Sequence, residues 1–330
     1  MSTSDQSTAA PQGGNAWIVA LAVICFGIIG FGMFYSTNTI SNPAFLAGQY
    51  LVYALFIWAV FHAIFLRKRG AKISGISFAA LFIALFAGGM IAASKQQQQA
   101  AQAVSSIQQE LGRVASASTD SSGLPARIER TTIGNPKAKG EFGEMERFVK
   151  EFLDRFVAQR NDHLLELDAI GWNFILDAKR IRNDTTLSES KVMIERAKII
   201  TEKYEKKTAD LVNGTRAHIN ALNMSESKKR VMLAGFERGM SESGKKIDEQ
   251  WKLEKQVLLQ FENIILLLAA RKSWVVQGEQ IIFNSEDDLT RFNSYIGTIQ
   301  RLAQQQEQIQ KSSFAEVSQT LNAMKNATEK

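Results

Sequence analysis

Two apolar segments joined by a basic loop are the feature that most limits how this chain can fold. Residues 50–66 and 76–93 contain no Lys, Arg, Asp or Glu. At about 1.5 Å of rise per residue, each run is long enough for the roughly 30 Å hydrocarbon core of a bilayer. Basic residues beside a span favour the cytoplasmic side. We therefore assign the basic residues of this region as topology-determining: Arg67, Lys68, Arg69 and Lys72.

A third apolar run, residues 16–34, also lacks charged side chains and follows a polar tail at residues 1–15. It has no basic segment before it and is longer than the apolar core of a secretory signal, so we interpret it as a retained span. We predict a membrane unit over residues 16–94 with three transmembrane helices. The predicted localisation is the plasma membrane or a bacterial inner membrane, with a cytoplasmic N-terminus and residues 95–330 extracytoplasmic. Long domains cross membranes with little regard to charge, so the opposite orientation stays open.

The net charge of +6 does not indicate nucleic-acid binding, because of where the charges lie. Residues 141–330 hold 29 Lys+Arg and 29 Asp+Glu, so the whole excess belongs to residues 1–140. We therefore expect no nucleic-acid partner. The single cysteine, Cys25, excludes an intramolecular disulfide and a zinc site built from cysteines.

Residues 141–330 show the three- to four-residue spacing of apolar side chains that is typical of long amphipathic helices. The clearest heptad, Ile247–Leu268, is interrupted only by Glu254, and the glutamines of Gln304–Gln310 interrupt the apolar stripe of the last helix. No segment alternates with period two for long enough to predict a strand. We predict an all-α fold with three transmembrane helices followed by an elongated antiparallel helical bundle or coiled coil. A helical extension and a linker containing Ser, Gly and Pro occupy residues 95–140.

Turn and capping signals predict the helix ends. Apolar positions over Met145–Ile181 predict one helix, which ends at a turn over residues 183–185. Thr186–Glu189 fits a capping box for the next helix. Ser241–Gly244 indicates a break or kink in the helix that carries the heptad, and Ser285 is the expected cap of the last helix.

Motifs that indicate catalysis are weak in this sequence. There is no phosphate-binding loop, no dinucleotide fingerprint and no His-Glu-x-x-His motif. Ser188-x-x-Lys191 and Ser225-x-x-Lys228 have the spacing of a nucleophile and its base. Both lie at predicted helix starts, where serine and charged residues are common. We expect no enzyme activity, no cofactor and no metal site.

The function that these patterns favour is an integral membrane protein whose helical domain is a non-enzymatic interaction or assembly module. The expected partners are the lipid bilayer and other proteins or further copies of the chain. The candidate interface residues are Trp172, Trp251 and Trp274. A sensor or regulator that passes ligand or partner binding to the membrane is the alternative, and a subunit of a channel or transport complex is the third possibility.

Overall fold

The computed structural model describes residues 71–116, 135–271 and 273–328, and these residues are mostly helical, as predicted. In chain order the elements are α3 (Ala71–Ser116), α4 (Gly140–Ala169), the 3-10 turn η2 (Trp172–Phe174), α5 (Ala178–Asn183), α6 (Ser188–Ala221), α7 (Glu226–Ala270), β1 (Trp274–Gln277), β2 (Gln280–Phe283) and α8 (Glu286–Thr328). The helices α6, α7 and α8 contain 34, 45 and 43 residues.

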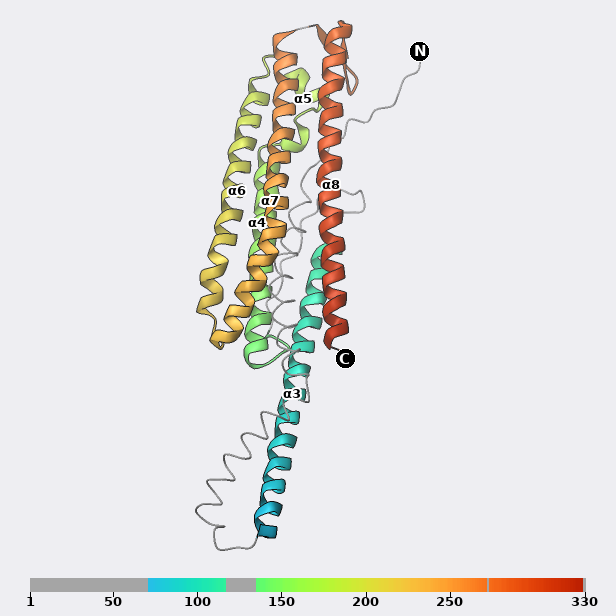
Figure 1. Cartoon of the computed structure of the whole chain (residues 1–330). Helices are drawn as coiled ribbons and strands as arrows, with labels where there is room; N and C mark the ends of the chain where they lie inside the picture. Colours follow the sequence, from blue (N-terminus) through green and yellow to red (C-terminus); the bar gives the residue numbers. More distant parts are fainter. Residues whose placement is uncertain (1–70, 117–134, 272, 329–330) are drawn as a thin grey trace.

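Helices α4, α6, α7 and α8 lie side by side and form an elongated bundle (Figure 1). Neighbouring helices α6 and α7, and α7 and α8, run in opposite directions, because the connections at the bundle ends reverse the chain. Contacts join α7 to α6 and α8, α4 to α3 and α6, and α3 to α8. The second half of α3 lies in the bundle, and its first half extends beyond the bundle end (Figure 1).

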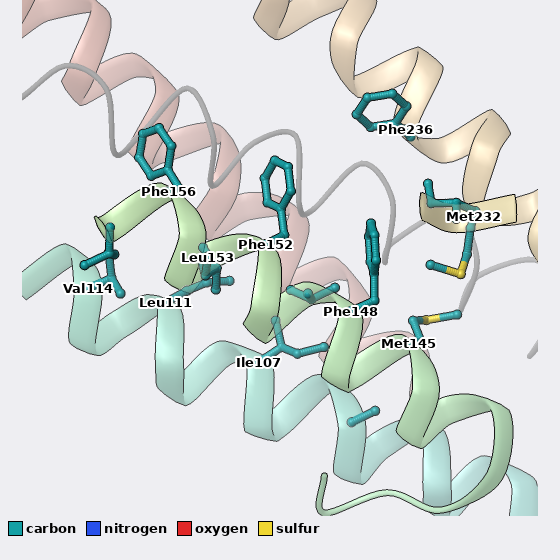
Figure 2. Close-up of a cluster of buried hydrophobic side chains, with 14 of the residues drawn as sticks. Ile107, Leu111, Val114, Met145, Phe148, Phe152, Leu153, Phe156, Met232 and Phe236 are labelled. Atoms are coloured by element: carbon teal, nitrogen blue, oxygen red, sulfur yellow. The ribbon is translucent and has the colours of Figure 1, made fainter. Parts of the chain in front are cut away.

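One core cluster fills the region where α3, α4, α6 and α7 meet. Phe148, Phe152 and Phe156 recur every four residues on α4, so they share one face of the helix, and all three are buried. In Figure 2 their rings project from one side of α4, while Ile107 and Leu111 approach α4 from the side of α3. Because it buries apolar side chains on two sides, α4 is an interior helix of this part of the bundle.

A second core cluster joins α7, α8 and the segment between α4 and α6. Phe261, Ile265 and Leu268, which belong to the predicted heptad, are buried in it. Ile299 and Leu302 of α8 belong to the same cluster. The apolar repeat therefore identified the buried face of α7 correctly.

The predicted single helix over residues 145–181 is wrong, because the chain breaks after Ala169. Gly171 adopts a left-handed conformation with φ 75°, which glycine tolerates without a steric penalty and which commonly ends helices. The chain then continues through η2 and α5, where Ile175 and Ile181 are fully buried. The predicted turn at residues 183–185 is confirmed.

Asp184 caps the start of α6, so the predicted Thr186–Glu189 capping box is wrong. Asp184 Oδ2 accepts hydrogen bonds from the backbone N–H and the Oγ–H of Ser190, both at 2.8 Å. Burial acts to raise the Asp184 pKa, but these hydrogen bonds outweigh it and hold the pKa below its ordinary value. Leu187 has φ 55°, and this left-handed residue directs the chain from the Asp184 turn into the helix.

Two other predicted boundaries have opposite outcomes. Helix α7 is continuous through Ser241–Gly244, so a break there is wrong, while the alternative of a kink stays a prediction. Ser243 is fully buried there, which indicates that a small side chain permits close packing at this position. Ser285 Oγ accepts a hydrogen bond from the backbone N–H of Asp288 at 3.3 Å, which confirms the predicted cap of α8.

The predicted membrane unit requires correction. Among the described residues, no helix combines the length and the apolar character that crossing a bilayer requires. Residues 76–93 do not form an element of their own, because α3 continues past them through Lys95 and the glutamines that follow it, and its last turns are buried in the bundle. Predicted spans 16–34 and 50–66 lie outside the described residues. The fold class with three transmembrane helices and the integral-membrane localisation drawn from it are therefore contradicted.

Adjacent residues of α7 provide a matched test of this packing. Ile265 is fully buried, whereas the side chain of Leu266 is half exposed, at 50 %. We expect Ile265→Ala to lower the free energy of unfolding by about 2–5 kcal/mol, because it leaves a cavity in the second core cluster. Leu266→Ala should lower it by less than about 1 kcal/mol. Chemical denaturation of both variants measures the difference, and equal losses would contradict the assigned helical face.

Candidate interaction site

A β-hairpin, which the sequence analysis did not predict, links α7 to α8. Strands β1 and β2 are antiparallel, with Val275 opposite Ile282 in the register. Gly278, with φ 65°, supplies the left-handed conformation that a tight hairpin turn needs. Each strand has only four residues. The expectation that residues 141–330 contain no strand is therefore wrong.

The inward face of the hairpin packs against the end of the bundle. Trp274, Ile281 and Phe283 are half-buried against the second core cluster. The indole Nε1–H of Trp274 donates a hydrogen bond of 2.8 Å to the backbone oxygen of Leu268 in the last turn of α7. The rings of Phe283 and Phe292 have their centroids 5.1 Å apart. These contacts fix one face of the hairpin on the helices.

Polar contacts hold the hairpin at β1 and at its base. On the side of β1, Arg182 Nη2 of α5 donates a hydrogen bond of 2.8 Å to the backbone oxygen of Val276. On the side of α8, Ser273 Oγ donates to Asp288 Oδ2 at 2.7 Å. Strand β1 neighbours α5 and strand β2 neighbours α8. The hairpin is thus fixed to the elements on either side of it.

The outward face of the hairpin carries an apolar pair. The side chains of Val275 and Ile282 are cross-strand neighbours and are 51 % and 37 % exposed. Gln277 and Gln280 follow on the same face beside the turn. An apolar centre with polar residues around it is the arrangement found in protein–protein interfaces. We name Val275 and Ile282 the outward pair.

The three tryptophans predicted as interface residues lie in different places, and the structure does not bring them together. Trp274 anchors the hairpin, and its strand also carries half of the outward pair. Trp172 packs edge-to-face on Phe261, with ring centroids 5.1 Å apart. Trp251 is buried in the first core cluster. An interface role for each of the three stays a prediction.

The residues predicted to determine topology lie largely outside the described part of the chain. Arg67, Lys68 and Arg69 are not among the described residues, and Lys72 belongs to the first turn of α3. Their assignment stays a prediction, without support from a membrane-spanning helix among the described residues.

A layer of aromatic and polar side chains joins α4, α6 and α7 near the middle of the bundle. The His163 ring lies with its centroid 5.0 Å from that of Tyr204 and 6.1 Å from that of Trp251. Tyr204 Oη and Lys203 Nζ donate hydrogen bonds of 2.7 and 2.6 Å to Glu166 Oε1 at the rim. Burial lowers the pKa of His163 to about 4, so this imidazole is neutral at pH 7. A buried, neutral histidine between aromatic rings is a core residue.

The Ser225-x-x-Lys228 motif forms a joint between helix starts. Lys228 Nζ and the backbone N–H of Ser225 bind the two carboxylate oxygens of Glu141, at 2.7 and 2.5 Å. Burial acts to raise the pKa of Glu141, but the hydrogen bonds from Lys228 and Ser225 outweigh it and lower the pKa to about 2. Because Lys228 and Ser225 both bind Glu141, the motif connects the start of α4 to the start of α7.

Neither ligand chemistry nor similarity assigns this chain a function. Among residues 71–116, 135–271 and 273–328, no group of three or more His, Cys, Asp and Glu side chains is placed to hold a metal ion. No protein-family model, curated protein or solved structure matches the chain. The geometry of the hairpin end is therefore the basis for a functional proposal.

Neighbouring isoleucines of β2 test which face of the hairpin supports the fold. Ile281 packs against the second core cluster, whereas Ile282 points outward. We expect Ile281→Ser to lower the free energy of unfolding by about 1–3 kcal/mol, because it places a hydroxyl in an apolar contact. The change for Ile282→Ser should stay within about 1 kcal/mol. Chemical denaturation measures both, and a larger loss for Ile282→Ser would contradict the assigned faces.

His163 gives the bundle a component of stability that depends on pH. The folded chain binds a proton at His163 only near pH 4, whereas an unfolded histidine binds one near pH 6.5. The contribution of His163 to the free energy of unfolding is therefore present above pH 6.5 and is lost as the pH falls toward 4. Between pH 8 and pH 5, the free energy of unfolding of the unmodified chain should fall by about 2 kcal/mol relative to that of His163→Phe. Parallel pH profiles for the two proteins would refute this.

Proposed function

We propose that this chain is a non-enzymatic interaction module that binds a protein partner through the outward pair of its hairpin. The observation that carries the proposal is the exposure of Val275 and Ile282 as cross-strand neighbours on a hairpin whose other face packs against the bundle. A further exposed apolar side chain, Leu289, lies on α8, the helix that β2 contacts.

The hairpin is not required to connect the two helices it joins. Antiparallel helices are commonly joined by two to five residues, and the connection over residues 271–285 is longer. A two-stranded hairpin is only marginally stable by itself, so the contacts of Trp274 and Phe283 are needed to hold it. Because these contacts involve only the inward face, the outward pair is available for a partner.

The position of the hairpin also suits a binding role. Helix α7, with 45 residues, is about 65 Å long at 1.5 Å per residue. The hairpin lies at one end of the bundle, and the first half of α3 projects from the other end (Figure 1). A rigid bundle of this length would hold a partner at the hairpin well away from the projecting part of α3.

Site-specific photo-crosslinking tests the proposal in cells that produce the full-length chain. A benzophenone amino acid replaces Val275 or Ile282, and in the control it replaces Ile199, an exposed apolar residue of α6 that is remote from the hairpin in the sequence. We expect crosslinked protein adducts from positions 275 and 282 and none from position 199. Peptides of this same chain in the adduct would identify a second copy as the partner. Absence of adducts at the hairpin, or equal yields at all three positions, would refute the proposal.

The strength of the association provides a second measurement with the same pair of residues. Removing apolar anchors from the centre of an interface commonly costs more than 1 kcal/mol each. The double variant Val275→Ser/Ile282→Ser should therefore weaken binding to the crosslinked partner by about tenfold or more. The control is Val192→Ser/Ile199→Ser on the exposed face of α6, which should bind as the unmodified chain does.

A further inference from the structure

The seam between α7 and α8 contains one deeply buried carboxyl group. Glu254 Oε2 accepts a hydrogen bond of 3.1 Å from Gln306 Nε2 of α8. Gln250, one turn earlier on α7, donates from Nε2 to the backbone oxygen of Gln306 at 3.2 Å. All three residues are more than nine-tenths buried. We name Gln250, Glu254 and Gln306 the seam layer.

The seam layer contains more hydrogen-bond acceptors than donors. The side-chain oxygens Oε1 of Gln250 and Gln306 are buried without a hydrogen-bond partner among the described residues. An ionised Glu254 adds only acceptors to this layer, whereas the neutral carboxylic acid adds one O–H donor. Neutral Glu254 thus supplies a donor that the layer lacks. The ionised form leaves a buried charge with a single neutral donor, which is unfavourable.

Among the described residues, no cation from a neighbouring helix offsets the burial of Glu254. Burial raises the pKa of Glu254 to about 7, and the hydrogen bond from Gln306 is the one opposing effect. Other titratable groups on the helices around α7 are engaged in ion pairs or hydrogen bonds, or belong to α4. They are Lys198, Glu205 and Arg216 of α6, each in an ion pair with α7, Tyr204 of α6, Glu316 of α8, paired with Lys246, and Arg160 and His163 of α4.

The seam layer divides the contact between α7 and α8 into two parts. On the hairpin side, Ile299 and Leu302 of α8 are buried in the second core cluster. On the other side, Ser243 of α7 and Ser313 of α8 are fully buried, and Ile309 of α8 is partly buried against the second core cluster. Burial of apolar surface is the main stabilising contribution to helix packing. Among the side chains of α8 that the structure describes, those of residues 303–316 therefore bury less apolar surface than those of residues 289–302.

We propose that Glu254 is a proton-controlled latch, in which the neutral acid holds residues 303–316 of α8 on the bundle and loss of the proton releases them. Helix α8 also contacts α3, so release of this segment changes the surroundings of both α7 and α3. The latch belongs to the regulator class of functions and is independent of partner binding at the hairpin.

The pH dependence of the opening follows from which state, closed or open, binds the Glu254 proton more tightly. In the closed bundle Glu254 keeps its proton up to about pH 7, whereas a solvent-exposed glutamate loses it near its ordinary pKa of 4.5. Opening therefore releases a proton between these values and becomes more favourable as the pH rises through this window, until it levels off above pH 7. Between pH 6 and pH 8, the equilibrium constant for opening should increase roughly tenfold.

Hydrogen–deuterium exchange of the full-length chain measures this opening. Labelling times at pH 6 and pH 8 are scaled for the chemical exchange rate, so that the remaining difference reports the opening equilibrium. We expect backbone amides of residues 303–316 to lose protection roughly tenfold between the two pH values, and those of residues 289–302 to lose less. The variant Glu254→Gln, which is permanently neutral and keeps donors in the layer, should show no such change. The matched control, Glu249→Gln, alters a rim carboxylate of α7 that pairs with Lys252 and should behave as the unmodified chain does.

Three results would overturn the latch. The first is unchanged protection of residues 303–316 between pH 6 and pH 8 in the unmodified chain. The second is the same pH response in Glu254→Gln as in the unmodified chain, and the third is an equal loss of protection in all helices. If Glu254→Gln does not fold, Glu254→Met provides a neutral side chain of similar size and should abolish the response in the same way.

Discussion

The burial of α7 on two sides is the constraint on which the rest of the bundle depends. This helix contacts both α6 and α8, and its side chains enter both core clusters. Apart from buried Glu254, ion pairs on α7 lie at its rims, where Lys255 pairs with Glu205 and Glu262 pairs with Lys198. Exposed ion pairs of this kind contribute at most about 1 kcal/mol each, so apolar burial along α7 supplies the stability. The direction of α7 then determines where the hairpin and the seam layer lie.

The length of a pattern decided how much of the fold could be predicted from the sequence. The heptad of α7 extends over many turns, and its apolar positions are buried as expected. Features that depend on one or two residues were missed. Gly171 ends α4 through a single left-handed conformation, and Asp184 caps α6 only because Leu187 directs the chain back over it. The hairpin strands, with four residues each, are shorter than the alternation needed to predict a strand.

The candidate site and the seam layer were accessible to sequence analysis only in part. The sequence analysis named Trp274 as a candidate interface residue, and the structure shows that it anchors the hairpin. The outward pair depends on the pairing register of β1 and β2, which only the structure shows. Glu254 and the glutamines near Gln306 interrupt apolar repeats in two separate helices. The structure brings these interruptions into one hydrogen-bonded layer. Each interruption weakens the apolar repeat of its own helix. Together they form one polar contact, because antiparallel α7 and α8 place them at the same level along the bundle.

Two buried titratable groups of opposite sign lie about one turn apart along the inner face of the bundle. His163 packs near Trp251, and Glu254 follows Trp251 by three residues. Burial lowers the pKa of His163 to about 4 and raises that of Glu254 to about 7. Between about pH 4.5 and 6.5, complete unfolding takes up a proton at His163 and releases one at Glu254.

These two contributions to the free energy of unfolding therefore have opposite slopes with pH, and they offset each other over this range. Release of residues 303–316 of α8 is different, because it exposes Glu254 to water while His163 stays packed between α4, α6 and α7. The free energy of this local opening therefore has no opposing contribution from His163 and keeps the full pH dependence of Glu254. A bundle with this arrangement responds to protons at one seam, whereas the contributions of His163 and Glu254 to its complete unfolding oppose each other between pH 4.5 and 6.5.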